Sequence, residues 1–422
     1  MKLYKHQEQA LAITKEQDHV AYYHDMGLGK TFTGAEKMIE LGARVNLVIC
    51  QKSKIDDWVE HFKKYYDVNP CDLTKVKATE LASFMEASKS VPVPSVYVIN
   101  YELAFRRPEL KKLKDFTLML DESSMIKNEQ AKRSKFILKL KPENVILLSG
   151  TPTGGKYEEL WSQIRLLGWD ISKKMFYNHY IDYHYDDSNG FPLMIIDGYK
   201  NEERLKRKMR EHGCHFLKTD EVFDLPDQIH QTIKIDTTKE YRKFRKSSIV
   251  TAGEVELVGE NTLTKMLYER QLCGLYNKDK LEAFRDLVES TNDRLIVFYN
   301  FTSELEAMKN VIEDTTTEWS FVNGNIKDLR AYEAVEHSIT FVQYQAGAMG
   351  LNLQKANKIV YFTPPLSSEL FEQSKKRIHR IGQDRTCFYY YLTCKNSIEE
   401  KIYRTLEMRK DYTEALFEQD TQ

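Results

Sequence analysis

The chain has 422 residues, of which 41% are hydrophobic and 30% are charged, and its formal net charge is −1. This composition fits a soluble globular protein, and the length exceeds what one core usually holds, so two or three domains are expected. A near-neutral balance excludes nucleic-acid binding through global charge, so any such affinity must come from local clusters of cations.

Targeting and cysteine signals are few. No apolar run approaches the ~18 residues of a membrane helix, and the N-terminal MKLYKHQEQAL lacks the apolar stretch of a signal peptide. The cysteines are scattered without a CxxC pair, which argues against a zinc site and a disulfide framework. We therefore expect a cytoplasmic protein without membrane contact, from a bacterium or a phage-infected cell.

Apolar runs alternate with charged, helical stretches in the first third of the chain. The runs span 19–23, 45–50, 95–101, 116–120 and 144–150. This alternation is typical of an α/β fold with a parallel sheet. From Tyr157 to about Glu289 the pattern is charged, aromatic and helical, and apolar runs then return at 294–301, 338–344 and 358–363.

We therefore predict an α/β protein with two lobes. The first lobe covers residues 1–225, with a helical part from about 157. The second covers 226–422, with a helical protrusion at about 236–289 and a C-terminal helix at 396–418. A capping-box pattern, Ser397 with Glu400, marks the start of that last helix.

The segment HDMGLGKT, from His24 to Thr31, resembles a phosphate-binding loop. Gly27 and Gly29 have no Cβ, so the chain can turn tightly and approach phosphates. Lys30 can place its charge on the β- and γ-phosphates, and Thr31 can offer a hydroxyl to magnesium. The usual pattern has a glycine where this chain has His24, so the match is to the shorter GxGKT form. A glycine turn with a surface lysine is the alternative.

Two adjacent acids follow the apolar run 116–120, in LDESSMIKN at 120–128. Such a run is typical of a strand buried on both faces of a parallel sheet, and these sheets bind ligands at the carboxyl ends of their strands. Asp121 is expected to hold magnesium, directly or through water, and Glu122 to polarise an attacking water. Behind a phosphate loop, the pair indicates a nucleotide-hydrolysing enzyme rather than a solvated strand end.

Two other segments are less specific. SGTP at 149–152 could sense a γ-phosphate, although alone it favours an ordinary strand exit. In EQSKKRIHRIGQ at 372–383, Arg377 and Arg380 are three residues apart and would share a face of a helix. Arginine suits phosphate recognition and transition-state charge, so the pair is a candidate arginine finger, with a solvated basic face as the alternative.

Together these motifs resemble the SWI/SNF-type ATPases of helicase superfamily 2, which are DNA translocases. They follow the family order from residue 3 to 383, and the segments 215–226 and 397–403 are also similar, so nearly the whole chain is covered. GLNL followed by HRIGQ is the most specific element. The motifs are KHQEQAL, DMGLGKT, VICQKSKIDDW, VINYE, DESSMIKN, LSGTP, AGAMGLNLQ and RIHRIGQ.

The resemblance implies two RecA-like lobes with parallel sheets and short helical insertions, working as a minimal ATP-dependent motor. It implies an adenine-reading role for Gln7 and catalytic roles for Lys30, Asp121 and Glu122, completed by Arg377 and Arg380 from the second lobe. Thr31 and Asp121 would hold Mg²⁺. The residues implied to bind ATP are Gln7, Met26, Gly27, Leu28, Gly29, Lys30, Thr31 and Asp121.

The same resemblance places Lys52, Ser53, Asn100 and Tyr101 in segments that track DNA phosphates. Duplex DNA, bound without sequence preference by a monomer, is the expected partner, with ATP and Mg²⁺ as cofactors. Basic clusters at 106–114, 127–141 and 200–210 are interrupted by acids or apolar residues, and most are expected to be solvated helix faces.

One departure from the family pattern is Ser124, which stands where relatives carry histidine and puts the coupling of that position to Gln383 in doubt. Three alternative functions stay open. They are a strand-separating DNA or RNA helicase, a scaffold with a vestigial site, and a simple P-loop phosphotransferase.

Overall fold

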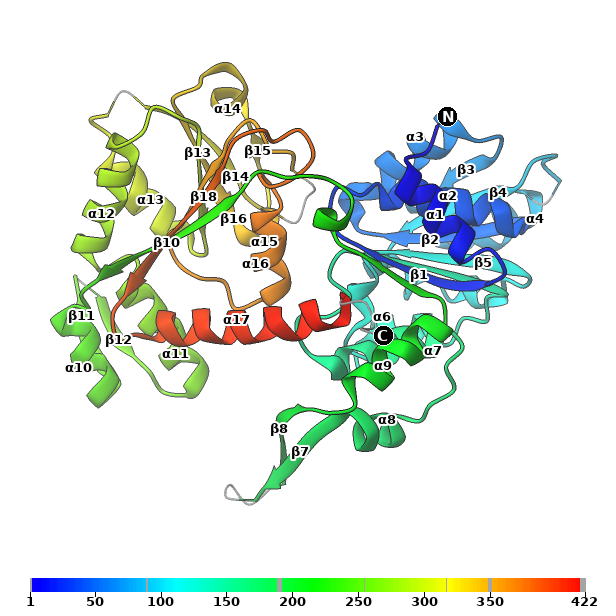
Figure 1. The fold of residues 1–422 in the computed structure, drawn as a ribbon, viewed down its shortest axis with the longest axis horizontal. Coiled ribbons are helices and arrows are strands. Elements are labelled where there is room, and N and C mark those ends of the chain that lie inside the picture. Colours follow the sequence, from blue (N-terminus) through cyan, green and yellow to red (C-terminus); the bar gives the residue numbers. More distant parts are fainter. Residues whose placement is uncertain are drawn as a thin grey trace. The chain divides into compact units, whose positions relative to one another are not determined.

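The computed structural model describes residues 2–88, 90–187, 192–253, 255–315, 317–347 and 351–417, and it divides into two compact units. Unit 1 is Met1–Val222 together with Asp411–Gln422, and unit 2 is Phe223–Lys410. Both contain a parallel sheet covered by helices (Figure 1), so the predicted α/β class with two parallel sheets is confirmed. In the part of the chain described, no helix has the length and apolar character needed to cross a membrane.

The sheet of unit 1 has seven parallel strands in the order β3-β4-β2-β5-β6-β1-β9. The strands are β1 (His19–His24), β2 (Val45–Cys50), β3 (Asn69–Asp72), β4 (Ser95–Asn100), β5 (Phe116–Asp121), β6 (Asn144–Ser149) and β9 (Cys214–Leu217). Because β5, β6 and β1 are neighbours, the segments that follow them lie side by side at the carboxyl edge of the sheet.

Helices cover both faces of this sheet. Along β1, Ala21 and Tyr23 belong to one hydrophobic cluster, whereas Val20 and Tyr22 belong to the other. The helices are α1 (Lys5–Ile13), α2 (Lys30–Leu41), α3 (Ile55–Tyr65), α4 (Leu81–Ser88), α5 (Tyr101–Ala104), α6 (Lys132–Ile137), α7 (Trp161–Leu166), α8 (Lys173–Tyr180) and α9 (Glu202–Glu211). An antiparallel hairpin, β7 (Ile181–Asp186) with β8 (Leu193–Tyr199), projects from the region expected to be helical (Figure 1).

The sheet of unit 2 has the order β10-β18-β17-β13-β16-β14-β15, and only β15 runs antiparallel to its neighbour. Its strands are β10 (Gln228–Ile235), β13 (Leu295–Tyr299), β14 (Glu318–Val322), β15 (Lys327–Asp328), β16 (Ser338–Gln343), β17 (Lys358–Tyr361) and β18 (Cys387–Cys394). Ile296 and Phe298 of β13 enter one core cluster and Leu295 and Val297 the other, so this sheet is also buried on both faces.

The helices of unit 2 are α10 (Lys239–Ser247), α11 (Thr262–Cys273), α12 (Lys278–Glu289), α13 (Thr302–Val311), α14 (Arg330–Ala334), α15 (Tyr344–Gly347), α16 (Ser368–Lys375) and most of α17 (Ile398–Phe417), whose residues from Asp411 on are grouped with unit 1. A hairpin of β11 (Ile249–Ala252) and β12 (Val255–Val258) lies within the predicted helical protrusion. Within the motif AGAMGLNLQ, residues 348–350 lie outside the described residues.

Candidate functional site

The loop between β1 and α2 has the backbone of an anion-binding loop. Gly27 has φ +90° and Gly29, the N-cap of α2, has φ +72°, a left-handed conformation that favours glycine. Lys30 Nζ donates to the carbonyl oxygens of His24, at 2.7 Å, and Asp25, at 3.1 Å. Its ammonium is therefore held at the N-terminus of a helix, where backbone N–H groups and the helix dipole attract anions.

Helix α1 fixes this loop from the side. Gln7 Nε2 donates to the carbonyl of Gly29 at 3.1 Å, and Gln7 Oε1 accepts the backbone N–H of Tyr4 at 2.9 Å. His6 Nε2 lies 2.9 Å from the carbonyl oxygen of Leu28. A Cβ on Gly29 would lie 2.4 Å from Gln7 Nε2, so only glycine fits there. Gln7 is buried and holds the loop, so reading an adenine would require its amide to exchange these partners.

The acid pair lies at the end of β5. Asp121 Oδ2 accepts the indole N–H of Trp58 at 2.8 Å, and burial raises the pKa of Asp121, opposed by this hydrogen bond and by the charge of Lys30. Glu122 has φ +60°, an uncommon value for a residue with a side chain. The buried Tyr101 hydroxyl donates to the carbonyl of Asp121 at 3.0 Å and to that of Glu122 at 3.3 Å, which supports the turn.

The SGTP segment joins the acid pair rather than forming a plain strand exit. Ser149 Oγ donates to Glu122 Oε1 at 2.8 Å and accepts the backbone N–H of Thr151 at 3.2 Å. Ser124 Oγ donates to the same Oε1 at 3.3 Å. One carboxylate oxygen of Glu122 is therefore oriented by two serines, one on each neighbouring loop.

Sequence reasoning missed Trp58 and Gln163. Gln163 Oε1 accepts hydrogen bonds from Ser123 Oγ at 2.7 Å and Tyr23 OH at 3.0 Å, while its Nε2 donates to the carbonyl of Pro152 at 2.7 Å. It thus ties the loop after β5 to the loop after β6. No sequence signal pointed to Gln163, because its partners come from three distant segments. Trp58 lies within the motif VICQKSKIDDW, which could have drawn attention to it.

The residues of this edge fit a magnesium-bound nucleotide. Thr31 is exposed on the first turn of α2, and Asp121 ends the strand two places away in the sheet. Hydroxyl and carboxylate oxygens are ligands that magnesium accepts. Leu28 is buried and Met26 half-buried, so within the loop these two side chains shape the backbone that would receive phosphates.

In unit 2, the two candidate arginines differ in environment. Helix α16 ends at Lys375, so both lie in the turn that follows, and the prediction of a shared helix face is wrong. Arg377 is 4% exposed, and its Nη1 lies 3.5 Å from the carbonyl of Leu351. Arg380 is half-buried and donates to Asn352 Oδ1 at 2.6 Å. Burial lowers the pKa of Arg380. Arg380 is therefore the more accessible guanidinium.

Gln383 is occupied within unit 2. Its Nε2 donates to three backbone carbonyls, those of Gln354, Ala356 and Ile378, and its Oε1 accepts the backbone N–H of Arg385. The side chain thus holds the turn that carries Arg380, which is a positioning role.

The four candidate DNA contacts differ in their exposure to solvent. Lys52 and Ser53 are exposed on a 3-10 helix (Lys52–Lys54) directly after β2. Asn100 ends the neighbouring β4 and is 7% exposed, and its Nδ2 donates to Glu102 Oε2 at 2.8 Å. Tyr101 is fully buried beneath the acid pair. At this position Tyr101 supports the turn of the acid pair, and its predicted contact with DNA stays a prediction.

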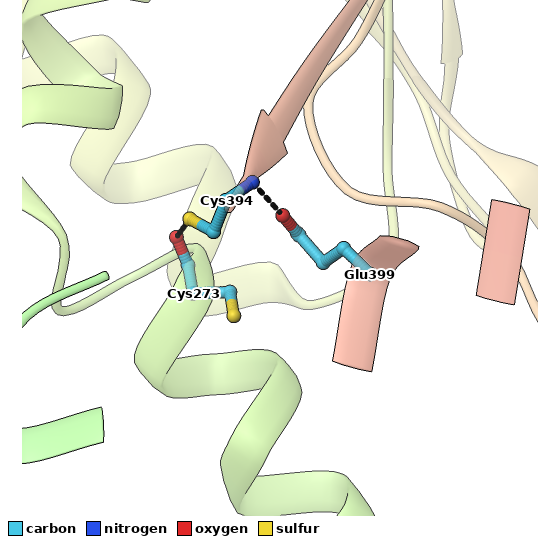
Figure 2. A group of neighbouring side chains, drawn as sticks. All are labelled: Cys273, Cys394 and Glu399. Carbon is cyan, nitrogen blue, oxygen red and sulfur yellow. Dashed lines mark hydrogen bonds between the residues drawn. The ribbon is translucent and has the colours of Figure 1, made fainter. Parts of the chain in front are cut away.

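A second polar cluster lies inside unit 2 (Figure 2). The ligand atoms of Cys273, Cys394 and Glu399 are all within 4.8 Å of one another, from α11, β18 and α17. However, Glu399 Oε1 accepts Lys280 Nζ at 2.6 Å, and Oε2 accepts the backbone N–H of Cys394 at 2.9 Å. Asn277 Nδ2 also donates to Cys394 Sγ at 3.3 Å. The cluster is satisfied by a buried ion pair and needs no metal.

Comparison with known proteins shows the family. Residues 6–279 match the model of the SNF2-related domain, and residues 279–382 match that of the helicase conserved C-terminal domain. A solved structure, the Sulfolobus solfataricus SWI2/SNF2 ATPase core in complex with dsDNA, is similar with a TM-score of 0.45 at 20% identity, covering 98% of this chain and 92% of that one.

Curated relatives extend the comparison. The SWI/SNF-related matrix-associated actin-dependent regulator of chromatin subfamily A member 1 of Mus musculus is 22% identical over 91% of this chain and 40% of its own length. An uncharacterized ATP-dependent helicase of Mycoplasma genitalium is 22% identical over 94% of this chain and 40% of its own length. The chain thus spans less than half the length of these relatives, and, by its matched domains, it belongs to the SNF2-related family.

Proposed function

We propose that the chain is an ATP-hydrolysing motor that moves along duplex DNA without separating its strands. The observation that carries this proposal is the convergence of Lys30, Asp121 and Glu122 at neighbouring strand ends of one sheet, with Ser149 bonded to Glu122. The family assignment supports it, because relatives that align with at least 90% of this chain are named as an ATP-dependent helicase and a chromatin-remodeling complex ATPase.

The proposed chemistry is attack of water on the γ-phosphorus of ATP, which breaks the bond to the bridging oxygen and releases ADP and phosphate. Glu122 orients and polarises this water through the carboxylate that Ser149 and Ser124 position. Lys30 moves from the loop carbonyls to the β- and γ-phosphates. Thr31 and Asp121 would hold magnesium, which would supply stabilisation of the charge that develops on the phosphate oxygens.

Arg380 is proposed to act on the γ-phosphate as an arginine supplied by unit 2, so that hydrolysis requires both units. Its partial exposure and its hydrogen bond to a neutral partner, Asn352, support this role. Arg377, which is buried against Leu351, is proposed to position that turn.

Duplex DNA is proposed to contact the exposed Lys52 and Ser53, together with Asn100 at the adjacent strand end. These side chains can reach phosphates but provide no base-reading geometry, so binding is expected to be independent of sequence and sensitive to salt. Tyr101, which follows Asn100, hydrogen-bonds to the backbone carbonyls of Asp121 and Glu122. A shift of this edge on DNA would therefore change the orientation of the catalytic acid.

Strand separation is the weaker alternative. The β7–β8 hairpin does expose Tyr185 and Leu193, as a separating wedge would. However, Asp182, Asp186 and Asp197 lie on the same hairpin and would repel DNA phosphates. The hairpin therefore favours a role away from the DNA backbone.

The test is a pair of assays on the same preparation. Displacement of a triplex-forming strand from duplex DNA, dependent on ATP, is the expected activity, with little unwinding of a forked duplex. Lys30→Ala and Glu122→Gln serve as controls that should abolish displacement. Unwinding of the fork without triplex displacement would replace translocation by strand separation.

A further inference from the structure

Helix α10 of unit 2 carries a group of cations that the basic clusters of the sequence analysis did not include. This nine-residue helix has five cations and one acid: Lys239, Arg242, Lys243, Arg245, Lys246 and Glu240. Tyr241 and Phe244 are buried, so the helix packs through one face and exposes its cations on the other.

Three of these cations border a cavity of about 520 Å³. Arg242, Arg245 and Lys246 come from α10, and Lys395 comes from the turn between β18 and α17. The only acid in the lining is Asp236, whose Oδ1 lies 2.9 Å from Lys395 Nζ. The lining therefore keeps an excess of positive charge after its one ion pair is counted.

Hydrogen bonds to the backbone fix the walls of this cavity. The backbone N–H of Ile398 donates to Tyr241 OH at 2.7 Å, which attaches α10 to the start of α17. Arg245 Nη1 donates to the carbonyl of Asn396 at 3.0 Å and so stays at the rim. Arg242 and Lys246 have no ion pair or side-chain hydrogen bond among the described residues, so their charge is available to a ligand.

Two of the basic clusters noted in the sequence analysis, at 127–141 and 200–210, differ from α10 because their cations lie next to acids. On α9, Lys206 pairs with Glu203, and Lys208 pairs with Glu211. In the segment 127–141, Lys127 lies 3.7 Å from Glu159. These cations are partly neutralised by neighbouring acids, whereas the three α10 cations that line the cavity face a single acid, Asp236, which is paired with Lys395 and also interacts with Arg242. Charge complementarity therefore points to an anion at α10.

We propose that the α10 cavity is a second contact for the phosphate backbone of duplex DNA, carried by unit 2 and centred on Arg242 and Lys246. Spacing of cations along a helix suits a polyanion with repeated phosphates better than a single small anion. This inference rests on the proposed function, because it takes DNA as the ligand of the motor.

The experiment compares the full chain with the double variant Arg242→Gln/Lys246→Gln, in titrations of a fluorescent duplex between about 50 and 200 mM salt. Removing two phosphate contacts should lower the slope of log affinity against log salt by about 1.8, and weaken binding at least tenfold at about 0.1 M salt. ATP hydrolysis without DNA should stay unchanged, which shows that the fold is intact.

Two controls sharpen the result. Arg207→Gln/Lys208→Gln removes the same charge from the exposed face of α9 and should change affinity less than about twofold, apart from general screening. Arg242→Lys/Lys246→Arg keeps the charge and should retain the wild-type slope. Salt slope and affinity equal to wild type in the glutamine variant would overturn the inference.

Other outcomes remain distinguishable. If the glutamine variant binds duplex normally but loses binding of polyglutamate, the surface serves an acidic protein segment and the inference fails. If the wild type itself binds no duplex at any salt concentration, the proposed function fails, and with it the inference. If the wild type binds duplex and the glutamine variant binds it with the same affinity and salt slope, the inference about α10 fails while the proposed function stands.

Discussion

The burial of Asp121, a candidate site residue, lowers the stability of the folded protein at neutral pH. Its pKa is raised by burial above the ordinary value of 3.8. For an acid, this means that the unfolded chain ionises first as the pH rises, so stability is lost between the unfolded and the folded pKa. At neutral pH the ionised carboxylate of Asp121 therefore lowers the stability of unit 1 when no magnesium is bound.

We predict that Asp121→Asn raises the melting temperature of the nucleotide-free protein at neutral pH while abolishing ATP hydrolysis. Asparagine still offers an oxygen to the Trp58 indole, so the hydrogen bond is kept. Calorimetry at pH 7 without magnesium measures the change. An unchanged or lower melting temperature would show that the carboxylate is not penalised by burial.

Substitution of Arg380 should lower activity, whereas substitution of Arg377 should lower stability. Arg380→Ala is expected to lower ATP turnover by about 10³-fold or more without changing the melting temperature, because an arginine finger acts on transition-state charge. Arg377→Ala should lower the melting temperature, because Arg377 is buried. Steady-state kinetics and thermal unfolding of both variants decide between them. Normal hydrolysis by Arg380→Ala removes the finger assignment.

The sequence predicts Lys30, Asp121 and Glu122 as site residues because short motifs encode their chemistry directly. It could not identify Gln163 or the buried place of Tyr101, because these depend on contacts between segments far apart in the chain. The turn carrying Arg380 differs from the predicted helix because α16 ends at Lys375, before either arginine.

At the scale of elements, sequence predicted most strands well, because strands buried on both faces of a parallel sheet read as continuous apolar runs. The β7–β8 hairpin was not predicted, because its strands are partly exposed and carry charged residues between apolar ones. The apolar run of β8, Leu193–Ile196, is only four residues long, which is too short to distinguish a strand from a segment of buried helix.

The junction of α12, β18 and α17 depends on a buried ion pair, Lys280 with Glu399, both fully buried. Lys280→Met should cost about 3–5 kcal/mol of unfolding free energy, because it leaves Glu399 buried without its counter-charge. Lys280→Met/Glu399→Leu should recover much of this loss. Denaturant unfolding of the three proteins measures it. Equal losses in the single and double variants would mean that packing, not charge, sets the cost.

Ser149 connects two elements of unit 1, and Ser149→Ala should leave ATP binding intact but misorient Glu122. Turnover should fall by about 10-fold or more, since a positioned general base contributes on the order of 10²–10⁴. Nucleotide affinity and turnover, measured together, test this. Wild-type turnover in the alanine variant would remove Ser149 from the positioning of the acid.

For the whole molecule, we predict that ATP hydrolysis responds to DNA, since the proposed DNA contacts and Glu122 lie at the same edge of the sheet of unit 1. The most direct measurement is the ATPase rate with duplex DNA, single-stranded DNA and RNA at two salt concentrations, with Glu122→Gln as the blank. The account predicts the largest stimulation by duplex DNA, weakened at the higher salt concentration. A wild-type rate that no nucleic acid changes, or that RNA alone raises, would contradict it.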